Sequence, residues 1–74
     1  MIAVSYWRAT FINMQSEIQC IYMKADTEQE AIELCNSTPI AYNPEWRCIR
    51  GEQITAQQLP DCIKRDYRKQ GIKV

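Results

Sequence analysis

The chain has 74 residues, of which 46% are hydrophobic and 24% charged, and its formal net charge is zero. This composition is typical of an ordinary globular protein and excludes an intrinsically disordered chain. A chain of this length forms a single domain, residues 1–74, with little room for the walls of a deep catalytic cleft. No apolar run approaches the roughly 20 residues of a membrane-spanning helix, and residues 1–4 lack the basic start of a signal peptide. We therefore expect a cytoplasmic protein with no membrane segment.

Residues 2–12 and 17–25 predict two strands, because both segments contain many β-branched and aromatic residues and lack glycine and proline. Residues 13–16 contain no glycine, which disfavours a two-residue turn and predicts a four-residue loop. That loop length pairs Ile12 with Glu17 and Tyr6 with Met23. Alternation then assigns Ile2, Val4, Tyr6, Ile21, Met23 and Ala25 to one face of the hairpin, and Trp7, Ala9, Phe11, Ile18, Cys20 and Tyr22 to the other.

A short helix follows, beginning near Thr27 and ending near residue 36. Thr27 and Glu30 have the spacing of a capping box, and Asp26 with Gln29 offers the same arrangement one residue earlier. The apolar face of this helix consists of Ala31, Ile32, Leu34 and Cys35.

Because the second strand leads directly into this helix, we expect the helix to cover the face that holds Met23 and Ala25. The aromatic face of Trp7, Phe11 and Tyr22 then needs a cover of its own. The alternatives are a second helix, another copy of the chain or a binding partner.

The segment Ser37-Thr38-Pro39 predicts the end of the first helix, since a residue before proline avoids helical geometry. Residues 46–54 predict a third strand, with Gly51 at a bulge or near the strand end, and residues 55–59 a single turn. Pro60 suits the first position of a second helix that ends near residue 70, with Gly71 as its C-terminal cap. Its buried stripe consists of Leu59, Ile63 and Tyr67. The predicted fold is α+β, a three-stranded antiparallel sheet in the order β-β-α-β-α.

Metal and cofactor sites have no support in the residue spacing. The chain contains no histidine and four cysteines, Cys20, Cys35, Cys48 and Cys62, of which no two form a CxxC pair. Zinc sites usually show ligands paired a few residues apart, so we expect no metal and no cofactor. Two disulfides are an alternative, but without a secretion signal we expect small buried thiols.

The sequence also indicates a protein that is not an enzyme. Without histidine it lacks the commonest general base, and a cysteine beside Leu34 in an apolar stripe is a poor nucleophile. Its two glycines, Gly51 and Gly71, are too far apart to form a phosphate-binding loop. We therefore assign no catalytic residue.

A protein-binding module is the function that these patterns favour. Tyrosine, tryptophan and arginine carry much of the energy of protein interfaces, and the chain has four tyrosines and two tryptophans. The partner-binding candidates are the aromatic sheet face and the charged rim of the first helix: Trp7, Phe11, Tyr22, Glu28 and Glu33. Self-association into a homodimer through the same aromatic face is an alternative.

A resemblance supports this interpretation. Two N-terminal strands, the segment Met23-Lys24-Ala25-Asp26-Thr27-Glu28-Gln29-Glu30-Ala31-Ile32 and a third strand resemble the plan of small accessory proteins of phages and mobile elements. Inhibitors of host defence, anti-CRISPR-like proteins among them, share that plan. The resemblance covers about the first 55 residues. It implies a stoichiometric inhibitor or adaptor whose partner is a larger host protein or complex.

Nucleic-acid binding is the alternative function, and it depends on the charge distribution. Residues 1–60 contain four basic and seven acidic residues, a net charge of −3, whereas residues 61–74 contain five basic and two acidic residues, a net charge of +3. The basic-patch candidates lie on the second helix: Lys64, Arg65, Arg68 and Lys69. They could contact phosphates, while the acidic first helix and the neutral total charge oppose such binding.

Overall fold

The computed structural model describes residues 5–74 and confirms a small α+β fold. In chain order the elements are β1 (Ser5–Asn13), β2 (Ile18–Ala25), α1 (Glu28–Asn36), α2 (Pro39–Tyr42), β3 (Trp46–Ile54), a 3₁₀ turn (Ala56–Gln58) and α3 (Asp61–Lys69). Residues 2–4 of the predicted first strand lie outside the described residues. The short helix α2 was not predicted. It begins at Pro39, which is preorganised for a first helical position, so the proline that ends α1 also starts the next turn of helix.

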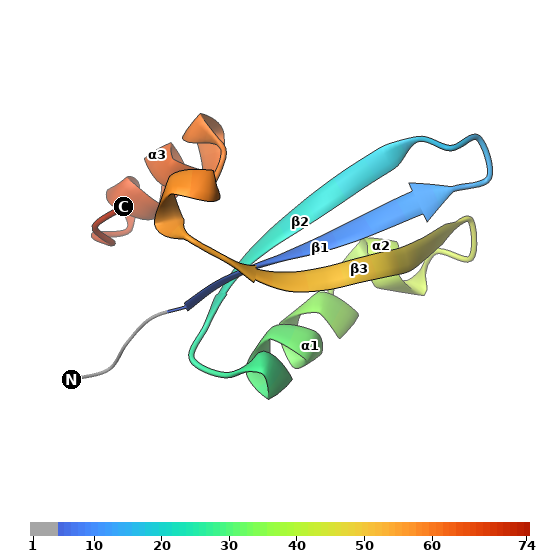
Figure 1. The fold of residues 1–74 in the computed structure, drawn as a ribbon, viewed down its shortest axis with the longest axis horizontal. Coiled ribbons are helices and arrows are strands. Elements are labelled where there is room, and N and C mark those ends of the chain that lie inside the picture. Colours follow the sequence, from blue (N-terminus) through green and yellow to red (C-terminus); the bar gives the residue numbers. More distant parts are fainter. Residues whose placement is uncertain (1–4) are drawn as a thin grey trace.

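The three strands form one antiparallel sheet in the order β2-β1-β3, so the first strand in sequence is the central one (Figure 1). Helices α1 and α2 lie on one face of the sheet, and α3 lies over one end of the other face. Within residues 5–74, β2 and β3 each pair only with β1, so both are edge strands.

The predicted register of the first hairpin was wrong by one residue. Ile12 pairs with Ile18 and Tyr6 with Lys24, rather than with Glu17 and Met23. The Asn13 N–H donates to the carbonyl of Glu17 at 3.2 Å, so three residues rather than four connect the hydrogen-bonded positions. This shorter loop requires Ser16 to adopt the left-handed conformation, with φ of 63°, a position that usually needs glycine.

Asn13 stabilises this tight loop through its side chain. Its Oδ1 accepts hydrogen bonds from the backbone N–H groups of Gln15 and Glu17, at 3.0 and 2.9 Å. An asparagine at this position replaces part of the backbone hydrogen bonding of the turn, which lets Ser16 take its unusual conformation. Glycine was therefore not required for a short connection.

The register change redistributes the side chains between the two faces of the sheet. Trp7 and Phe11 lie on the same face as Met23, beneath α1, and we call this the α1 face. Tyr22 lies on the opposite face with Tyr6, which we call the α3 face. The helix thus covers the face that holds Met23, as predicted, but the separate aromatic face of Trp7, Phe11 and Tyr22 does not exist.

Helix α1 begins with the predicted cap, in a modified form. The hydroxyl of Thr27 accepts a hydrogen bond from the Glu30 N–H at 3.2 Å, whereas the Glu30 carboxylate accepts from the Asp26 N–H, one residue before the cap. Ala31 is the buried residue of this helix, Cys35 is half-buried, and Ile32 and Leu34 are each 44% exposed. The helix therefore contacts the sheet along a narrow stripe, which leaves part of its apolar face uncovered.

Helix α3 follows the predicted pattern closely. Leu59 is 3% exposed and packs with Tyr6 and Ile54, and Ile63 and Tyr67 from the helix contact this cluster. The ring of Tyr67 stacks on Tyr6 with centroids 5.9 Å apart. Burial raises the pKa of the Tyr67 hydroxyl, and the nearby Tyr6 adds to the rise.

Gly71 ends helix α3 as the sequence predicted. Its φ of 86° lies in the left-handed region. The N–H of Gly71 donates to the carbonyl of Arg68 at 3.0 Å and the N–H of Ile72 donates to that of Tyr67 at 2.9 Å. This pair of hydrogen bonds is the Schellman motif, which satisfies carbonyls that the helix end would otherwise leave free.

Candidate functional site: an open groove between α1 and β3

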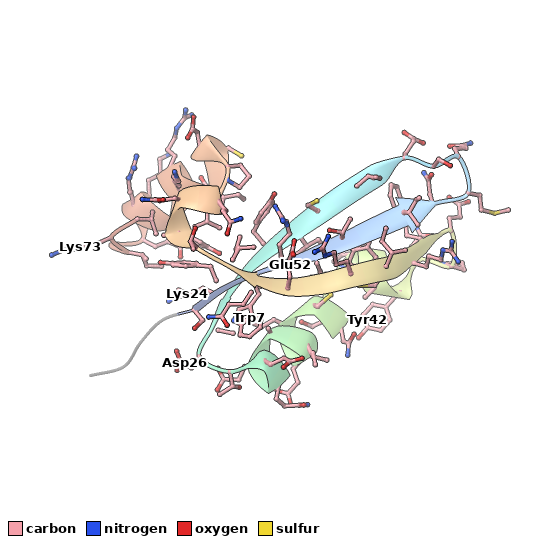
Figure 2. All side chains as sticks on the ribbon, viewed as in Figure 1. Trp7, Lys24, Asp26, Tyr42, Glu52 and Lys73 are labelled. Atoms are coloured by element: carbon pink, nitrogen blue, oxygen red, sulfur yellow. The ribbon has the colours of Figure 1, made fainter. Side chains whose placement is uncertain are left out.

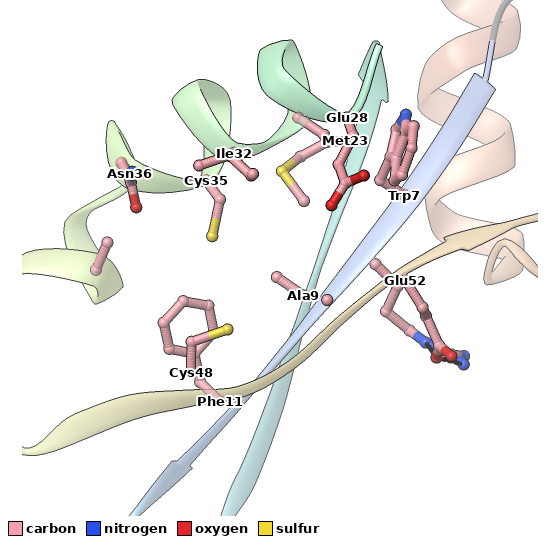
Figure 3. Close-up of a pocket in the computed structure, with 14 residues that line it drawn as sticks. Trp7, Ala9, Phe11, Met23, Glu28, Ile32, Cys35, Asn36, Cys48 and Glu52 are labelled. Atoms are coloured by element: carbon pink, nitrogen blue, oxygen red, sulfur yellow. Dashed lines mark hydrogen bonds and ion pairs between the residues drawn. The ribbon is translucent and has the colours of Figure 1, made fainter. Parts of the chain in front are cut away.

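A groove of about 210 Å³ lies on the α1 face, between helix α1 and strand β3 (Figure 3). Most of its lining is apolar: Trp7, Ala9, Phe11, Met23, Ala31, Ile32, Cys35, Ala41, Cys48 and Gly51, with Arg8, Glu28, Asn36 and Glu52 completing it. The groove exists because α1 packs mainly over β2 and α2 contacts β3, so part of the sheet between α1 and β3 stays uncovered.

Two small residues form the centre of the groove floor. Ala9 on β1 pairs directly with Gly51 on β3. A Cβ atom added at Gly51 would meet no atom within 4 Å, so the space above this glycine is empty. An isolated glycine within a strand often marks a position where a ligand or another backbone approaches closely. Gly51 is therefore a signal in the sequence for the floor of this groove.

Strand β3 is interrupted by a bulge next to this floor. Thr10 pairs with Arg50 and Phe11 with Cys48, so Ile49 is an additional residue that faces no partner on β1. Ile49 is 50% exposed. The bulge keeps Cys48 and Gly51 on the α1 face, and it therefore determines which side chains reach the groove.

Aromatic residues bound the floor on both sides. Trp7 lies beside the start of α1 (Figure 2), and its indole N–H donates to the carbonyl of Ala25 at 3.1 Å. Phe11 is 3% exposed and packs in a cluster with Ala9 and Met23. Trp7 and Phe11 therefore have a structural role, and only part of their surface faces the groove.

An ion pair lies on the α3 face of the same strands. The guanidinium of Arg8 donates two hydrogen bonds to Glu52, and Arg50 Nη2 lies 3.2 Å from Glu52 Oε2. The hydrogen bond from Arg8 holds the pKa of the Glu52 carboxyl below its usual value. This pairing leaves Glu28 as the groove carboxylate without an ion-pair partner among the described residues.

Two thiols from different elements reach the groove. Cys35 lies on α1 and Cys48 on β3, and both are free (Figure 3). Burial raises the pKa of the Cys35 thiol, and the charge of the nearby Cys48 adds to the rise. The expectation of buried thiols holds in part for Cys35, which is half-buried, and is wrong for Cys20, Cys48 and Cys62, which are exposed. These three lie on edge strands or on the outer side of α3.

The structure brings together three of the five predicted partner-binding residues. Trp7, Phe11 and Glu28 all line the groove. Tyr22 lies on the opposite face, with the cluster around Tyr6, and Glu33 is exposed on α1 outside the groove. Sequence reasoning missed Ala9, Gly51 and Cys48, because the floor of the groove depends on the strand register.

The predicted basic patch is separate from the groove. Arg65, Arg68 and Lys69 are exposed on α3, and Lys64 is half-buried. Arg68 Nε donates to the carbonyl of Val74 at 3.0 Å, so this side chain is partly engaged in holding the chain end. Asp61 and Asp66 lie on the same helix and reduce its positive charge.

In the part of the chain that the structure describes, no helix is long and apolar enough to cross a membrane. No three His, Cys, Asp or Glu side chains among residues 5–74 are grouped as metal ligands. Comparisons with protein-family models, with curated proteins and with solved structures found no match to this chain.

Proposed function

We propose that the protein is a non-catalytic binding module that receives a protein partner in the groove between α1 and β3. The observation that carries this proposal is that α1 leaves part of β3 uncovered, so a mostly apolar groove stays open beside the cluster around Phe11. The groove, at about 210 Å³, is smaller than the roughly 300–1,000 Å³ of pockets that enclose small molecules. A few side chains of a larger protein suit such a groove better than a small ligand does.

The free edge of β3 suggests how the partner binds. Within residues 5–74, β3 pairs only with β1, so its outer backbone groups are open to another strand. An extended segment added along β3 would gain main-chain hydrogen bonds, and its alternate side chains would enter the groove above Gly51. Backbone pairing supplies affinity in this mode, and the groove supplies specificity.

The charges around the groove indicate the chemistry of that segment. Helix α1 carries Glu28, Glu30 and Glu33 and has no basic residue in its last turn. Glu28 also lines the groove. A partner segment with apolar residues flanked by lysine or arginine complements this rim, and charge complementarity favours correct partners and fast association.

The biological role that fits this binding mode is a stoichiometric inhibitor or adaptor of a host protein complex, as encoded by phages and mobile elements. The support is the resemblance of the first 55 residues to such accessory proteins, together with a groove that has no assigned catalytic group. The cytoplasm is the compartment in which such a partner would be met. The alternative, nucleic-acid binding through Lys64, Arg65, Arg68 and Lys69, is tested by the same experiment.

The test is affinity capture of the tagged protein from a lysate of its cell of origin, with and without nuclease, read by mass spectrometry. Gly51→Leu places a side chain in the groove without a clash at its Cβ, whereas Cys20→Leu places the same side chain on the α3 face and serves as the control. We expect a stoichiometric protein that survives nuclease, is lost with Gly51→Leu and is retained with Cys20→Leu.

Two outcomes contradict the proposal. A partner captured equally well by wild type and Gly51→Leu, with both variants folded by circular dichroism, excludes the groove as the binding surface. Recovery that is lost with nuclease, and lost when the four basic residues of α3 are replaced by glutamine, assigns the function to nucleic-acid binding.

A further inference from the structure

The α3 face of the sheet is covered at one end only. Helix α3 packs over the cluster around Tyr6, and in the described part of the chain the strands continue beyond it with no helix above them on this face (Figure 1). The strand register places two rows of side chains on this open part, which we call the open α3 rows. The first row is Cys20, Thr10 and Arg50, and the second is Ile18, Ile12 and Arg47.

Basic side chains line the β3 side of the open α3 rows. Arg47 and Arg50 are both exposed, and their partners on β1 are two residues apart, so they lie about 7 Å apart along the sheet. The row nearest α3 contains Arg8 and Glu52, which pair with each other. Three arginines and one glutamate give this part of the face a net charge of +2. On the β2 side, Ile18 is 62% exposed, so a basic strip lies beside an exposed apolar one.

Helix α1 carries a surface of complementary chemistry on its side away from the groove. Glu28 and Ile32 line the groove, whereas Glu30, Glu33 and Leu34 do not. Residues three and four apart are neighbours on a helix, so these last three lie together, and we call them the outer α1 strip. The helix contains no basic residue, and Leu34 is 44% exposed. The outer α1 strip is therefore acidic with an exposed apolar side chain.

We propose that the open α3 rows of one copy of the chain bind the outer α1 strip of a second copy. The two glutamates of the strip, about 5–6 Å apart, face the two arginines of the rows, and Leu34 contacts Ile18. Neither Glu33 nor Arg47 takes part in an ion pair within residues 5–74, so both charges are available to a second copy. Two sets of open α3 rows would not cover each other, because their arginines would repel.

The position of the two surfaces determines the form of the assembly. They lie on opposite sides of the sheet, so two copies cannot form both contacts with each other at once. Such a head-to-tail contact leaves one surface of each kind free at the ends, and further copies add to them. The contact leaves the groove between α1 and β3 open, so this proposal stands or fails independently of the proposed function.

The first experiment measures the mass of the purified, nuclease-treated wild-type chain by analytical ultracentrifugation over a series of protein concentrations. We expect an average mass that rises with concentration past that of a dimer, and an association that weakens with added salt because the contact pairs exposed charges. A chain that stays monomeric at every concentration, or a mass that stops at the dimer, overturns the proposal. Association that is present only before nuclease treatment assigns the basic strip to nucleic acid and overturns it as well.

Charge reversals test which surfaces meet. Glu33→Lys and Arg47→Glu each place like charges across the contact, and we expect each to weaken self-association about tenfold or more. Both changes in one chain restore opposite charges, and so does an equal mixture of the two single variants. We therefore expect recovery of most of the wild-type association in both cases. Loss without recovery, in variants that are folded by circular dichroism, contradicts the proposed pairing.

Two matched variants make the same changes of charge elsewhere. Glu28→Lys lies on the groove side of α1, and Arg65→Glu lies on the exposed surface of α3. We expect both to self-associate nearly as strongly as wild type. A loss with Glu28→Lys equal to that with Glu33→Lys would mean that the net charge of α1, rather than the outer α1 strip, controls the association, and would overturn the proposal.

Backbone amide chemical shifts of dilute and concentrated wild type locate the contact without a variant. We expect the amides of Ile18 and Leu34 to shift with concentration, whereas that of Gly51, on the exposed edge strand β3, stays constant. Shifts confined to residues around Gly51 would instead assign the association to pairing between β3 edges and contradict the proposal.

Discussion

On the α3 face of the sheet, Leu59 closes the cluster around Tyr6 and Ile54, and α3 covers it from above. On the α1 face, the cluster around Phe11 stays open beside β3, because α1 contacts the sheet only along a narrow stripe. Both clusters share the same three strands, so the sheet itself does not cause the difference. The difference arises from the helices: Ile63 and Tyr67 of α3 are half-buried against the cluster around Tyr6, whereas α1 leaves Ile32 and Leu34 each 44% exposed.

The two faces of this small domain therefore differ in how much apolar surface they leave accessible to a partner. A closed cluster stabilises the fold and leaves no surface to a partner. An open cluster gives up part of that burial and keeps an apolar surface accessible. The following predictions test this division, in order of decreasing effect.

Phe11→Ala should have the largest effect. The side chain is 3% exposed at the centre of the α1 cluster, and truncation of a buried phenylalanine costs about 3–5 kcal/mol. A domain of this size has only about 3–5 kcal/mol of net stability, so we expect a largely unfolded protein. Urea unfolding followed by circular dichroism measures this. A loss below about 1 kcal/mol would mean that the α1 cluster contributes little to the fold.

Leu59→Ala should destabilise the α3 cluster by about 2–4 kcal/mol. Leu59 is 3% exposed and joins α3 to Tyr6 and Ile54. We expect the amides of α3 to lose more protection from hydrogen exchange than those of α1, because the two clusters lie on opposite faces. Equal loss of protection in both helices contradicts a division into two clusters.

The chain's two glycines should respond in opposite directions. Gly71→Ala places a side chain at φ of 86° and should cost about 1–2 kcal/mol at the end of α3. Gly51→Ala adds a methyl group in the open groove and should stabilise the strand by about 0.5–1 kcal/mol. Thermal unfolding of both variants measures the contrast. Destabilisation by Gly51→Ala would mean that the groove floor has no room.

Thr27→Ala removes the cap of α1 and should cost about 1 kcal/mol, because the Glu30 N–H loses its acceptor. Thr27→Ser keeps the hydroxyl and should cost much less. Urea unfolding of both variants separates the effect of the lost hydrogen bond from the effect of the lost methyl group. Equal costs for the two variants would exclude the hydrogen bond as the source of the effect.

The smallest effect concerns pH and the ion pair beneath the groove. Arg8 lowers the pKa of Glu52 in the folded protein, so the stabilisation is present above the unfolded-state pKa and is lost as pH falls through the lower folded-state value. The stability difference between wild type and Glu52→Gln should therefore shrink between about pH 6 and about pH 2. Glu45→Gln, at an exposed residue outside this ion pair, is the control. A difference that persists at the acid end contradicts the assignment.

Local signals in the sequence predicted most of the fold. Strand β3 has the predicted bounds, Thr27 caps α1, and Gly71 ends α3 in the left-handed conformation that the sequence indicated. Each of these features depends on residues a few positions apart. Such short-range preferences act in the same way whatever the rest of the chain does.

The candidate site was predicted only in part, because it depends on long-range register. Ser16 in the left-handed conformation shortened the hairpin loop, and this single backbone choice moved Trp7 and Phe11 to the face of α1. A shift of one residue exchanges the two faces of a strand, so an error in one loop changed the predicted site. Cys35 on α1 and Cys48 on β3 both line the groove, although their spacing in the sequence did not indicate that they lie near each other.

The strand order has a consequence for the order of events during synthesis. The central strand β1 leaves the ribosome first and can pair with β2 within microseconds once Ala25 has emerged. The last residue of β3, Ile54, follows 29 residues later (54 minus 25), which takes about 1.5–6 s at usual translation rates. During those seconds α1 is already made, and the side of β1 that later receives β3 is open. We expect the nascent chain to need protection at this edge, and a ribosome-bound chain ending before β3 to bind chaperones more strongly than the finished protein does.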